Sequence, residues 1–264
     1  MAKQKKLYIG TNTKMYKTIP MTVAFLSELM QLTRDIPRDD LELFVIPSFT
    51  TLSSANGCVS PDLIRLGAQN MGWEEQGQFS GEISPLMLKE VGADIVMIGH
   101  SERRHVLMET DEMENKRVKC ALRNELIPLL CIGETGAEKN LGLSDEVLCT
   151  QIKIGLNGIS ADDARNLRIA YEPVWAIGTA GVPATKEYAE GKHGVIRGCL
   201  CNLFGEEIGN SIPILYGGSV NPQNAVELIR MDNIDGLFIG RSAWDAVQFN
   251  SIIRSVSPIW REKA

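Results

Sequence analysis

The sequence predicts a single (β/α)8 barrel, a closed ring of eight parallel strands surrounded by helices. Short apolar runs rich in Ile, Leu and Val recur along the 264 residues and barely alternate with polar residues, which is typical of strands covered on both faces. Segments with a helical spacing of apolar residues lie between these runs. No linker rich in Pro, Ser or Gly divides the chain, so we expect one domain over residues 1–264.

The expected strands follow one another at roughly 25–45 residues, the spacing of a β/α unit. In chain order they are Leu7–Gly10, Leu41–Ile46, Ile64–Gly67, Ile95–Ile98, Ile127–Cys131, Leu167–Tyr171, Ile212–Leu215 and Gly236–Ile239. The clearest helical patterns between them are Met21–Leu32, Ser84–Val91, Asp145–Leu156 and Tyr188–Phe204. A doubly wound sheet is the competing fold, but it usually carries G-x-G-x-x-G after its first strand. Here Gly10-Thr-Asn-Thr-Lys14 stands at that place.

Composition excludes several classes of protein. Hydrophobic residues make up 44% and charged residues 23% of the chain, too balanced for a disordered protein. Lys and Arg number 27 against 33 Asp and Glu, a net charge of 27 − 33 = −6, so we expect neither a nucleic-acid nor an anionic-membrane partner. No apolar run approaches the ~18 residues of a membrane span, and no signal sequence is recognisable at the start. We expect a cytoplasmic protein.

The cysteines and histidines suggest neither a disulfide framework nor a metal. The six cysteines form no C-x-x-C pair; they are Cys58, Cys120, Cys131, Cys149, Cys199 and Cys201. A chain of this length can bury its own core without disulfides, so we expect reduced thiols. The three histidines lack the spacing of metal ligands. We therefore expect no metal and no other cofactor.

Polar groups follow several of the expected strands, where a barrel carries its chemistry. The strand ends provide Asn12, Lys14, His100, Glu102, Glu134, Glu172, Gly178, Ser219, Gly240 and Arg241. A carboxylate, an imidazole and an ammonium group on one rim suit proton transfer next to a carbonyl. Glycine-bearing turns can bring backbone N–H groups to a phosphate. Each residue alone is compatible with a structural role, but their joint occurrence favours a catalytic site.

Five stretches resemble the triosephosphate isomerase family, and the likeness runs essentially end to end. They are Gly67–Asn70, Glu74–Ser84, Ile98–Arg104, Ala170–Thr179 and Tyr216–Val220. The resemblance implies that Glu172 is the catalytic base, His100 the electrophile and Lys14 the electrostatic residue with Asn12 beside it. It further implies that backbone N–H groups of Gly178, Ser219, Gly240 and Arg241 bind the phosphate, and that Glu102 is the acid beyond the histidine.

The sequence departs from the family pattern at three places, which cluster around the expected phosphate site and the flexible loop after Thr179, called the lid below. Thr13 stands where the family usually has Trp, the lid segment 180–185 reads Ala-Gly-Val-Pro-Ala-Thr in place of Gly-Lys-Thr-Ala, and Arg241 replaces a glycine. Arg241 could pair with the phosphate or turn away to pair with Asp245, and we favour Asp245. Because the departures spare Glu172 and His100, we expect the chemistry to be retained.

The resemblance gives the expected function. The principal expectation is interconversion of glyceraldehyde 3-phosphate and dihydroxyacetone phosphate, a step of glycolysis and gluconeogenesis. The alternative is a side branch of the family, the tetrulose-phosphate (erythrulose phosphate) isomerases of erythritol-type catabolism, because the lid and Arg241 resemble that branch. A non-catalytic phosphate-binding barrel is less favoured, since Lys14, His100 and Glu172 are all present. A Schiff-base aldolase is less favoured because Lys14 is the only lysine found at a strand end, and a lysine beside a phosphate needs to stay charged. Residues 69–84 resemble the loop through which the family forms homodimers, so we expect a homodimer.

Overall fold

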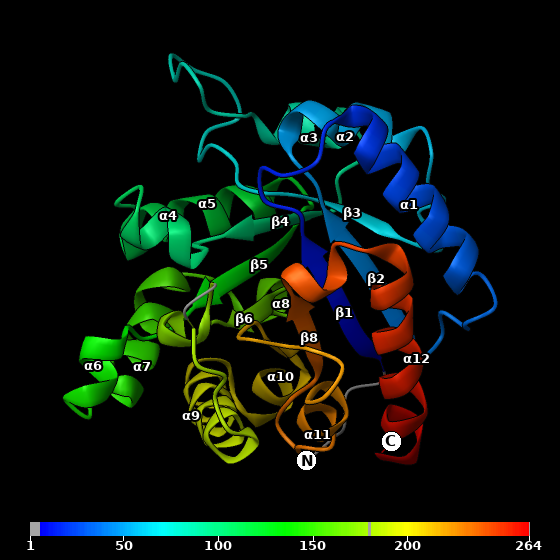
Figure 1. The fold of residues 1–264 in the computed structure, drawn as a ribbon. Coiled ribbons are helices and arrows are strands. Elements are labelled where there is room, and N and C mark those ends of the chain that lie inside the picture. Colours follow the sequence, from blue (N-terminus) through cyan, green and yellow to red (C-terminus); the bar gives the residue numbers. More distant parts are fainter. Residues whose placement is uncertain (1–5, 179–180, 264) are drawn as a thin grey trace.

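The computed structural model describes residues 6–178 and 181–263, and it confirms the predicted fold class (Figure 1). Eight parallel strands pair in sequence order, and β8 closes the barrel on β1. The strands are β1 Leu7–Asn12, β2 Leu41–Ile46, β3 Arg65–Ala68, β4 Ile95–Ile98, β5 Ile127–Ile132, β6 Arg168–Tyr171, β7 Ile214–Tyr216 and β8 Gly236–Ile239. Each coincides with a predicted run, with ends that differ by at most two residues.

Helices surround the barrel and include the four that the apolar spacing predicts. The α-helices are α1 Ile19–Thr33, α2 Phe49–Asn56, α3 Pro85–Glu90, α4 Ser101–His105, α5 Asp111–Arg123, α6 Gly136–Asn140, α7 Ser144–Gly155, α8 Ala161–Ala164, α9 Lys186–Phe204, α10 Glu206–Ser211, α11 Ala225–Ile229 and α12 Ala246–Lys263. Two 3-10 turns, η1 Val174–Ala176 and η2 Arg241–Ala243, follow β6 and β8. The side chains of Ser84 and Thr185 cap α3 and α9 by accepting N–H bonds from Leu86 and Tyr188.

The strands are buried on both faces, which explains why their apolar runs do not alternate. A smaller cluster fills the barrel; it consists of Phe44, Ile46, Ile95, Met97, Leu129, Cys131, Ala170, Leu215 and Phe238. A larger cluster lies between the strands and the helices. Gly10 leaves the space that the Phe44 ring occupies, since a Cβ there would lie 2.1 Å from a ring carbon. The packed interior makes the rim above it a rigid platform for a site.

The expectation that all six cysteines are reduced is wrong for one pair. Cys149 on α7 and Cys199 on α9 form a disulfide, with their Cα atoms 6.1 Å apart, within the range that a disulfide spans. The two helices pack side by side, so residues 50 positions apart in the sequence face each other. Sequence spacing alone does not reveal such a pair. Cys58, Cys120, Cys131 and Cys201 are free thiols.

His193, which is fully buried on α9, should make the fold sensitive to acid. Burial lowers the pKa of His193 to about 3, whereas histidine in an unfolded chain has a pKa of about 6.5. The unfolded chain therefore takes up a proton that the folded chain does not. The stability due to the neutral ring is complete above about pH 6.5 and is lost as the pH falls toward 3.

We expect the free energy of unfolding to fall with decreasing pH more steeply in the wild type than in His193→Phe. The difference in slope should approach at most about 1.4 kcal/mol per pH unit below pH 6. Urea unfolding at several pH values between about 4.5 and 7 measures this slope. The same substitution at the exposed His105 is the control. Equal slopes in the wild type and His193→Phe would contradict the expectation.

Candidate active site

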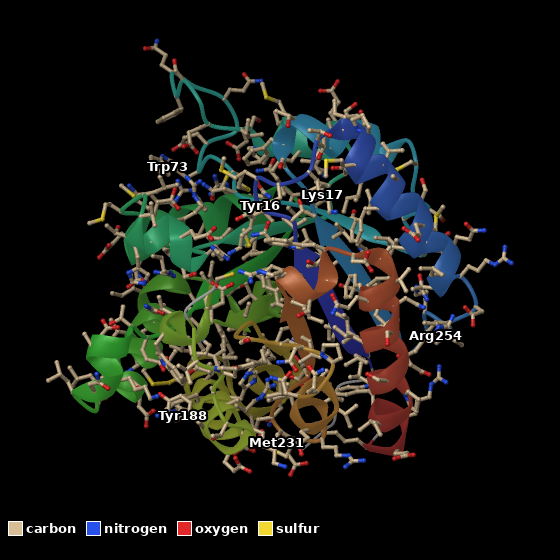
Figure 2. The ribbon with its side chains drawn as sticks, viewed as in Figure 1. Tyr16, Lys17, Trp73, Tyr188, Met231 and Arg254 are labelled. Carbon is tan, nitrogen blue, oxygen red and sulfur yellow. A yellow bond between two sulfur atoms is a disulfide. The ribbon has the colours of Figure 1, made fainter. Side chains whose placement is uncertain are left out.

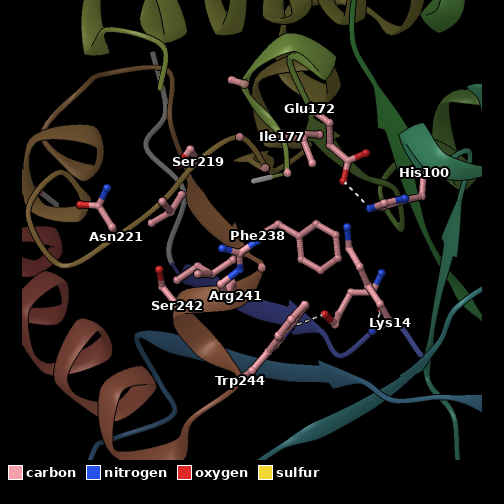
Figure 3. Close-up of a pocket in the computed structure, with 18 residues that line it drawn as sticks. Lys14, His100, Glu172, Ile177, Ser219, Asn221, Phe238, Arg241, Ser242 and Trp244 are labelled. Carbon is pink, nitrogen blue, oxygen red and sulfur yellow. Dashed lines mark hydrogen bonds and ion pairs between the residues drawn. The ribbon is translucent and has the colours of Figure 1, made fainter. Parts of the chain in front are cut away.

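One pocket at the carboxyl ends of the strands brings the predicted chemical groups together (Figure 3). Lys14 follows β1, His100 follows β4 and Glu172 follows β6. The lining residues are Asn12, Lys14, His100, Glu172, Ala176, Ile177, Gly178, Gly217, Gly218, Ser219, Val220, Asn221, Phe238, Ile239, Gly240, Arg241, Ser242 and Trp244. Of the strand-end residues named from the sequence, all except Glu102 and Glu134 line this pocket, and Glu102 is hydrogen-bonded to the pocket residue Lys14.

The Glu172 carboxylate is buried and held by two groups from the β4 end. Its Oε2 accepts a 3.1 Å hydrogen bond from the backbone N–H of Ser101, and its Oε1 lies 3.4 Å from His100 Nε2. The backbone of Glu172 packs against Gly133, where a Cβ would lie 1.8 Å from the Glu172 carbonyl oxygen. The glycine after β5 therefore allows the close approach that positions the base.

The imidazole of His100 is oriented by the start of α4. The Glu102 backbone N–H donates a 3.2 Å hydrogen bond to His100 Nδ1. Because Nδ1 accepts this bond, it carries no proton, and the proton of the neutral ring is on Nε2. The ring therefore presents an N–H donor toward Glu172 and the pocket. A neutral imidazole in this orientation can hydrogen-bond to a carbonyl oxygen and donate its proton as negative charge develops there.

Lys14 has a left-handed backbone conformation with φ 52°, which is uncommon for a residue other than glycine. Its N–H donates to Asn12 Oδ1 at 2.7 Å, and Gln69 Nε2 donates to both Asn12 Oδ1 and the Lys14 carbonyl. The ammonium group donates to Glu102 Oε1 at 2.6 Å. Glu102, which does not line the pocket, thus holds the ammonium group of Lys14, which does.

The opposite end of the pocket consists of turns that can bind an anion. Gly178 has φ 89°, which a glycine adopts readily. Ser219 and Gly240 follow β7 and β8, and the Asn224 side chain donates a 2.9 Å hydrogen bond to the Ser219 carbonyl. Gly218 leaves room for the Tyr216 hydroxyl, since a Cβ there would lie 2.3 Å from it. Of the lid segment, residues 179 and 180 lie outside the described residues.

Arg241 does not make the Asp245 ion pair that we favoured from the sequence. Asp245 instead accepts a 2.9 Å hydrogen bond from the Gln248 N–H at the start of α12. Only a short 3-10 turn covers Arg241, and α12 begins at Ala246, so the two side chains do not share a helical face. Within residues 6–178 and 181–263, the Arg241 guanidinium makes no ion pair. Arg241 lines the pocket beside Phe238 and Ser242 (Figure 3).

Two further residues support the site through contacts that the sequence did not reveal. Glu134 is fully buried, and its carboxylate accepts hydrogen bonds from the Tyr171 and Tyr188 hydroxyls and from Trp175 Nε1. Because Trp175 precedes Gly178 in the chain, this carboxylate anchors the segment that leads into the lid. Its position after β5 was visible in the sequence, but its three donors come from other elements. Trp244, which lines the pocket, is the second such residue.

The described residues contain no cluster of three or more His, Cys, Asp and Glu side chains that could hold a metal. They also include no helix long and apolar enough to cross a membrane. The pocket combines a carboxylate, an imidazole and an ammonium group with glycine-rich turns. Groups of these kinds are suited to proton transfer beside a carbonyl.

Comparisons with known proteins agree with this chemistry. A family model described as triosephosphate isomerase matches residues 7–256. The L-erythrulose-1-phosphate isomerase of Rhizobium etli is 45% identical over 253 residues, which cover 95% of this chain and 92% of the relative. The triosephosphate isomerase of Dictyoglomus thermophilum is 41% identical over 251 residues, covering 95% of this chain and all of the relative. The L-erythrulose-1-phosphate isomerase of Rhizobium meliloti is 42% identical, covering 95% and 97%.

Fold and site together define an isomerase that works by proton transfer within a barrel. The chain belongs to the triosephosphate isomerase family. The resemblance seen in the sequence is thereby confirmed.

Proposed function

We propose that this enzyme isomerises a short ketose phosphate through an enediolate. The Glu172 carboxylate removes a proton from the hydroxyl-bearing carbon beside the carbonyl, and the His100 Nε2–H donates to the carbonyl oxygen. The Lys14 ammonium stabilises the negative charge that develops on that oxygen. Glu172 then returns the proton to the former carbonyl carbon, and the neighbouring hydroxyl becomes the new carbonyl. The observation that carries the proposal is the 3.4 Å approach of Glu172 Oε1 to His100 Nε2 in the pocket of Lys14.

Two substrates fit this chemistry and share their phosphate end. Dihydroxyacetone phosphate, which gives glyceraldehyde 3-phosphate, is the substrate for which the family is named. A ketotetrose 1-phosphate has the same phosphate, the same bridging carbon and the same carbonyl. It differs only in carrying a hydroxymethyl group on the carbon that loses the proton. The extra group would therefore lie near Glu172 rather than near the phosphate.

The four-carbon substrate is the second candidate, and specific features favour it. Relatives with 45% and 42% identity carry the name L-erythrulose-1-phosphate isomerase, and the lid sequence departs from the family pattern. On this substrate the same proton transfer moves the carbonyl from C2 to C3. The product is therefore a second ketose, and an aldehyde assay would not detect it.

The deciding experiment follows both substrates by proton NMR in D2O. A proton on the carbon beside the carbonyl should be replaced by deuterium when the enzyme acts, whichever product forms. We expect kcat/KM for one of the two substrates to exceed that for the other by at least ~10²-fold, because a pocket shaped for one carbon count discriminates by a few kcal/mol. Glu172→Ala controls for uncatalysed exchange. Absence of catalysed exchange with both substrates would refute the proposed function.

We also propose a homodimer, in which the segment 69–84 of one subunit docks on the other. This segment projects from the barrel between β3 and α3 (Figure 1). Phe79 of this segment is 43% exposed, and Met15 and Tyr16, which follow β1, are 91% and 65% exposed. Figure 2 labels Tyr16 and, in the segment, Trp73. Such a surface is characteristic of an interface. Sedimentation should show a dimer, and a fully active monomer at nanomolar concentration would contradict this.

The proposed reaction also suggests where the enzyme works. A sugar phosphate is a dianion that does not cross a bilayer unaided. We therefore propose a cytoplasmic enzyme acting on phosphorylated sugars made in the same compartment. If the three-carbon substrate is correct, the reaction is the one shared by glycolysis and gluconeogenesis. Fractionation of the source cells, followed by immunodetection of this chain, tests the location.

A further inference from the structure

Trp244 connects the phosphate end of the pocket to the segment that carries Lys14. The residue follows η2, the turn that begins with Arg241, and its side chain lines the pocket. The indole Nε1–H donates a 2.8 Å hydrogen bond to the backbone carbonyl of Asn12, which lies 232 positions earlier in the chain. Figure 3 shows the indole directed toward the β1 end, next to Lys14.

Among residues 6–178 and 181–263, Trp244 provides the only hydrogen bond to the Asn12 carbonyl from this side. The β1–β8 ladder ends with Thr11 opposite Ile239. The Tyr8 N–H bonds to the Asp235 carbonyl on the β8 side, and because backbone orientation repeats every second residue, Asn12 faces the same side. Asn12 is only 5% exposed, and a buried carbonyl without a partner is costly. The indole thus extends the ladder by one side-chain bond.

The segment held in this way contains the strained residue of the site. A left-handed conformation at a residue other than glycine costs roughly 1–2 kcal/mol and persists only where surrounding contacts enforce it. Ser48 Oγ and Gln69 Nε2 donate to the Lys14 carbonyl at 2.9 and 2.7 Å. Those contacts come from the ends of β2 and β3. Trp244 contacts the same segment from the β8 side, at the Asn12 carbonyl.

We propose that Trp244 is a positioning residue for Lys14, an inference that rests on the proposed isomerase function. The indole fixes the Asn12 backbone, and Asn12 in turn orients Lys14 through its Oδ1. Thr13, which stands between these two residues, is buried. Trp244 supplies an aromatic ring to the same segment from the other end of the chain. The Tyr16 ring packs on it with centroids 4.6 Å apart.

Removing only the indole N–H tests this role. Trp244→Phe keeps an aromatic ring, and site-specific replacement by 3-benzothienylalanine keeps the whole indole shape without the N–H. We expect both to lower kcat ~10-fold with less than ~3-fold change in KM, because Lys14 acts mainly on the transition state. Trp260→Phe is the matched control. Trp260 is buried on α12, and its Nε1 has no hydrogen-bond partner among the described residues, so kcat should stay within ~2-fold.

A second readout does not depend on activity. The Trp244 indole N–H signal, identified as the one missing from the NMR spectrum of Trp244→Phe, should exchange slowly with solvent because its proton is bonded inside the fold. Fast exchange, or full kcat in the benzothienylalanine variant, would overturn the proposal. An inactive wild type would instead refute the isomerase function, while the exchange measurement would still test the bond.

Discussion

Glu172→Asp should lower kcat by ~10²–10³-fold while the fold is retained. The shorter side chain withdraws the carboxylate by about 1 Å, and a displacement of that size from a near-attack geometry costs about two orders of magnitude in rate. The backbone cannot advance to compensate. The Glu172 N–H bonds to the Ile132 carbonyl at 2.7 Å, and Gly133 packs against the Glu172 carbonyl. Steady-state kinetics on whichever substrate the wild type prefers measures the effect.

Glu172→Gln is the matched variant for the fold, because it keeps the side-chain length and can still accept the Ser101 N–H bond. It should be at least as inactive as Glu172→Asp, since an amide is not a base. Thermal unfolding should show that the wild type, Glu172→Asp and Glu172→Gln are all folded. Wild-type activity in Glu172→Ala would contradict the assignment of the base.

The architecture could be predicted because every strand is buried on both faces. Ile95–Ile98 is apolar throughout, and Leu41–Ile46 is interrupted only by Glu42, which is buried; the structure gives both strands with the predicted bounds. Lys14, His100 and Glu172 were placed together for a similar reason. The carboxyl ends of parallel strands meet on one rim of a barrel, so chain position alone brings these residues into one pocket.

Side-chain partners across distant elements could not be predicted in this way. The three donors to Glu134 come from β6, the turn after it and α9, and the Cys149–Cys199 pair depends on how α7 packs on α9. The bond between Trp244 and Asn12 joins the two ends of the chain. Such contacts depend on the angle between elements, which no local spacing encodes. The expected pair of Arg241 with Asp245 was wrong for a related reason. It required both residues to lie in one helix, but α12 begins only at Ala246.

Because Arg241 lines the pocket and does not pair with Asp245, a different partner is expected for its guanidinium group. Its exposed guanidinium lines the pocket beside Gly240 and Ser242, and it has no ion-pair partner among the described residues. The phosphate of a bound substrate carries up to two negative charges and would lie at this end. We therefore propose that Arg241 pairs with the phosphate, in addition to the backbone N–H groups of the turns.

Arg241→Gly should therefore weaken inhibition by inorganic phosphate about 30-fold, equal to the ~2 kcal/mol typical of a hydrogen bond between charged groups. Arg241→Gln, which keeps a polar side chain without the charge, should fall between the glycine variant and the wild type. Three-carbon and four-carbon substrates present the same phosphate, and their difference lies at the carbon near Glu172. The ratio of their kcat/KM values should therefore change by less than ~3-fold in Arg241→Gly. An unchanged phosphate inhibition constant would exclude the pairing, whereas a large shift in that ratio would mean that Arg241 reaches the sugar carbons.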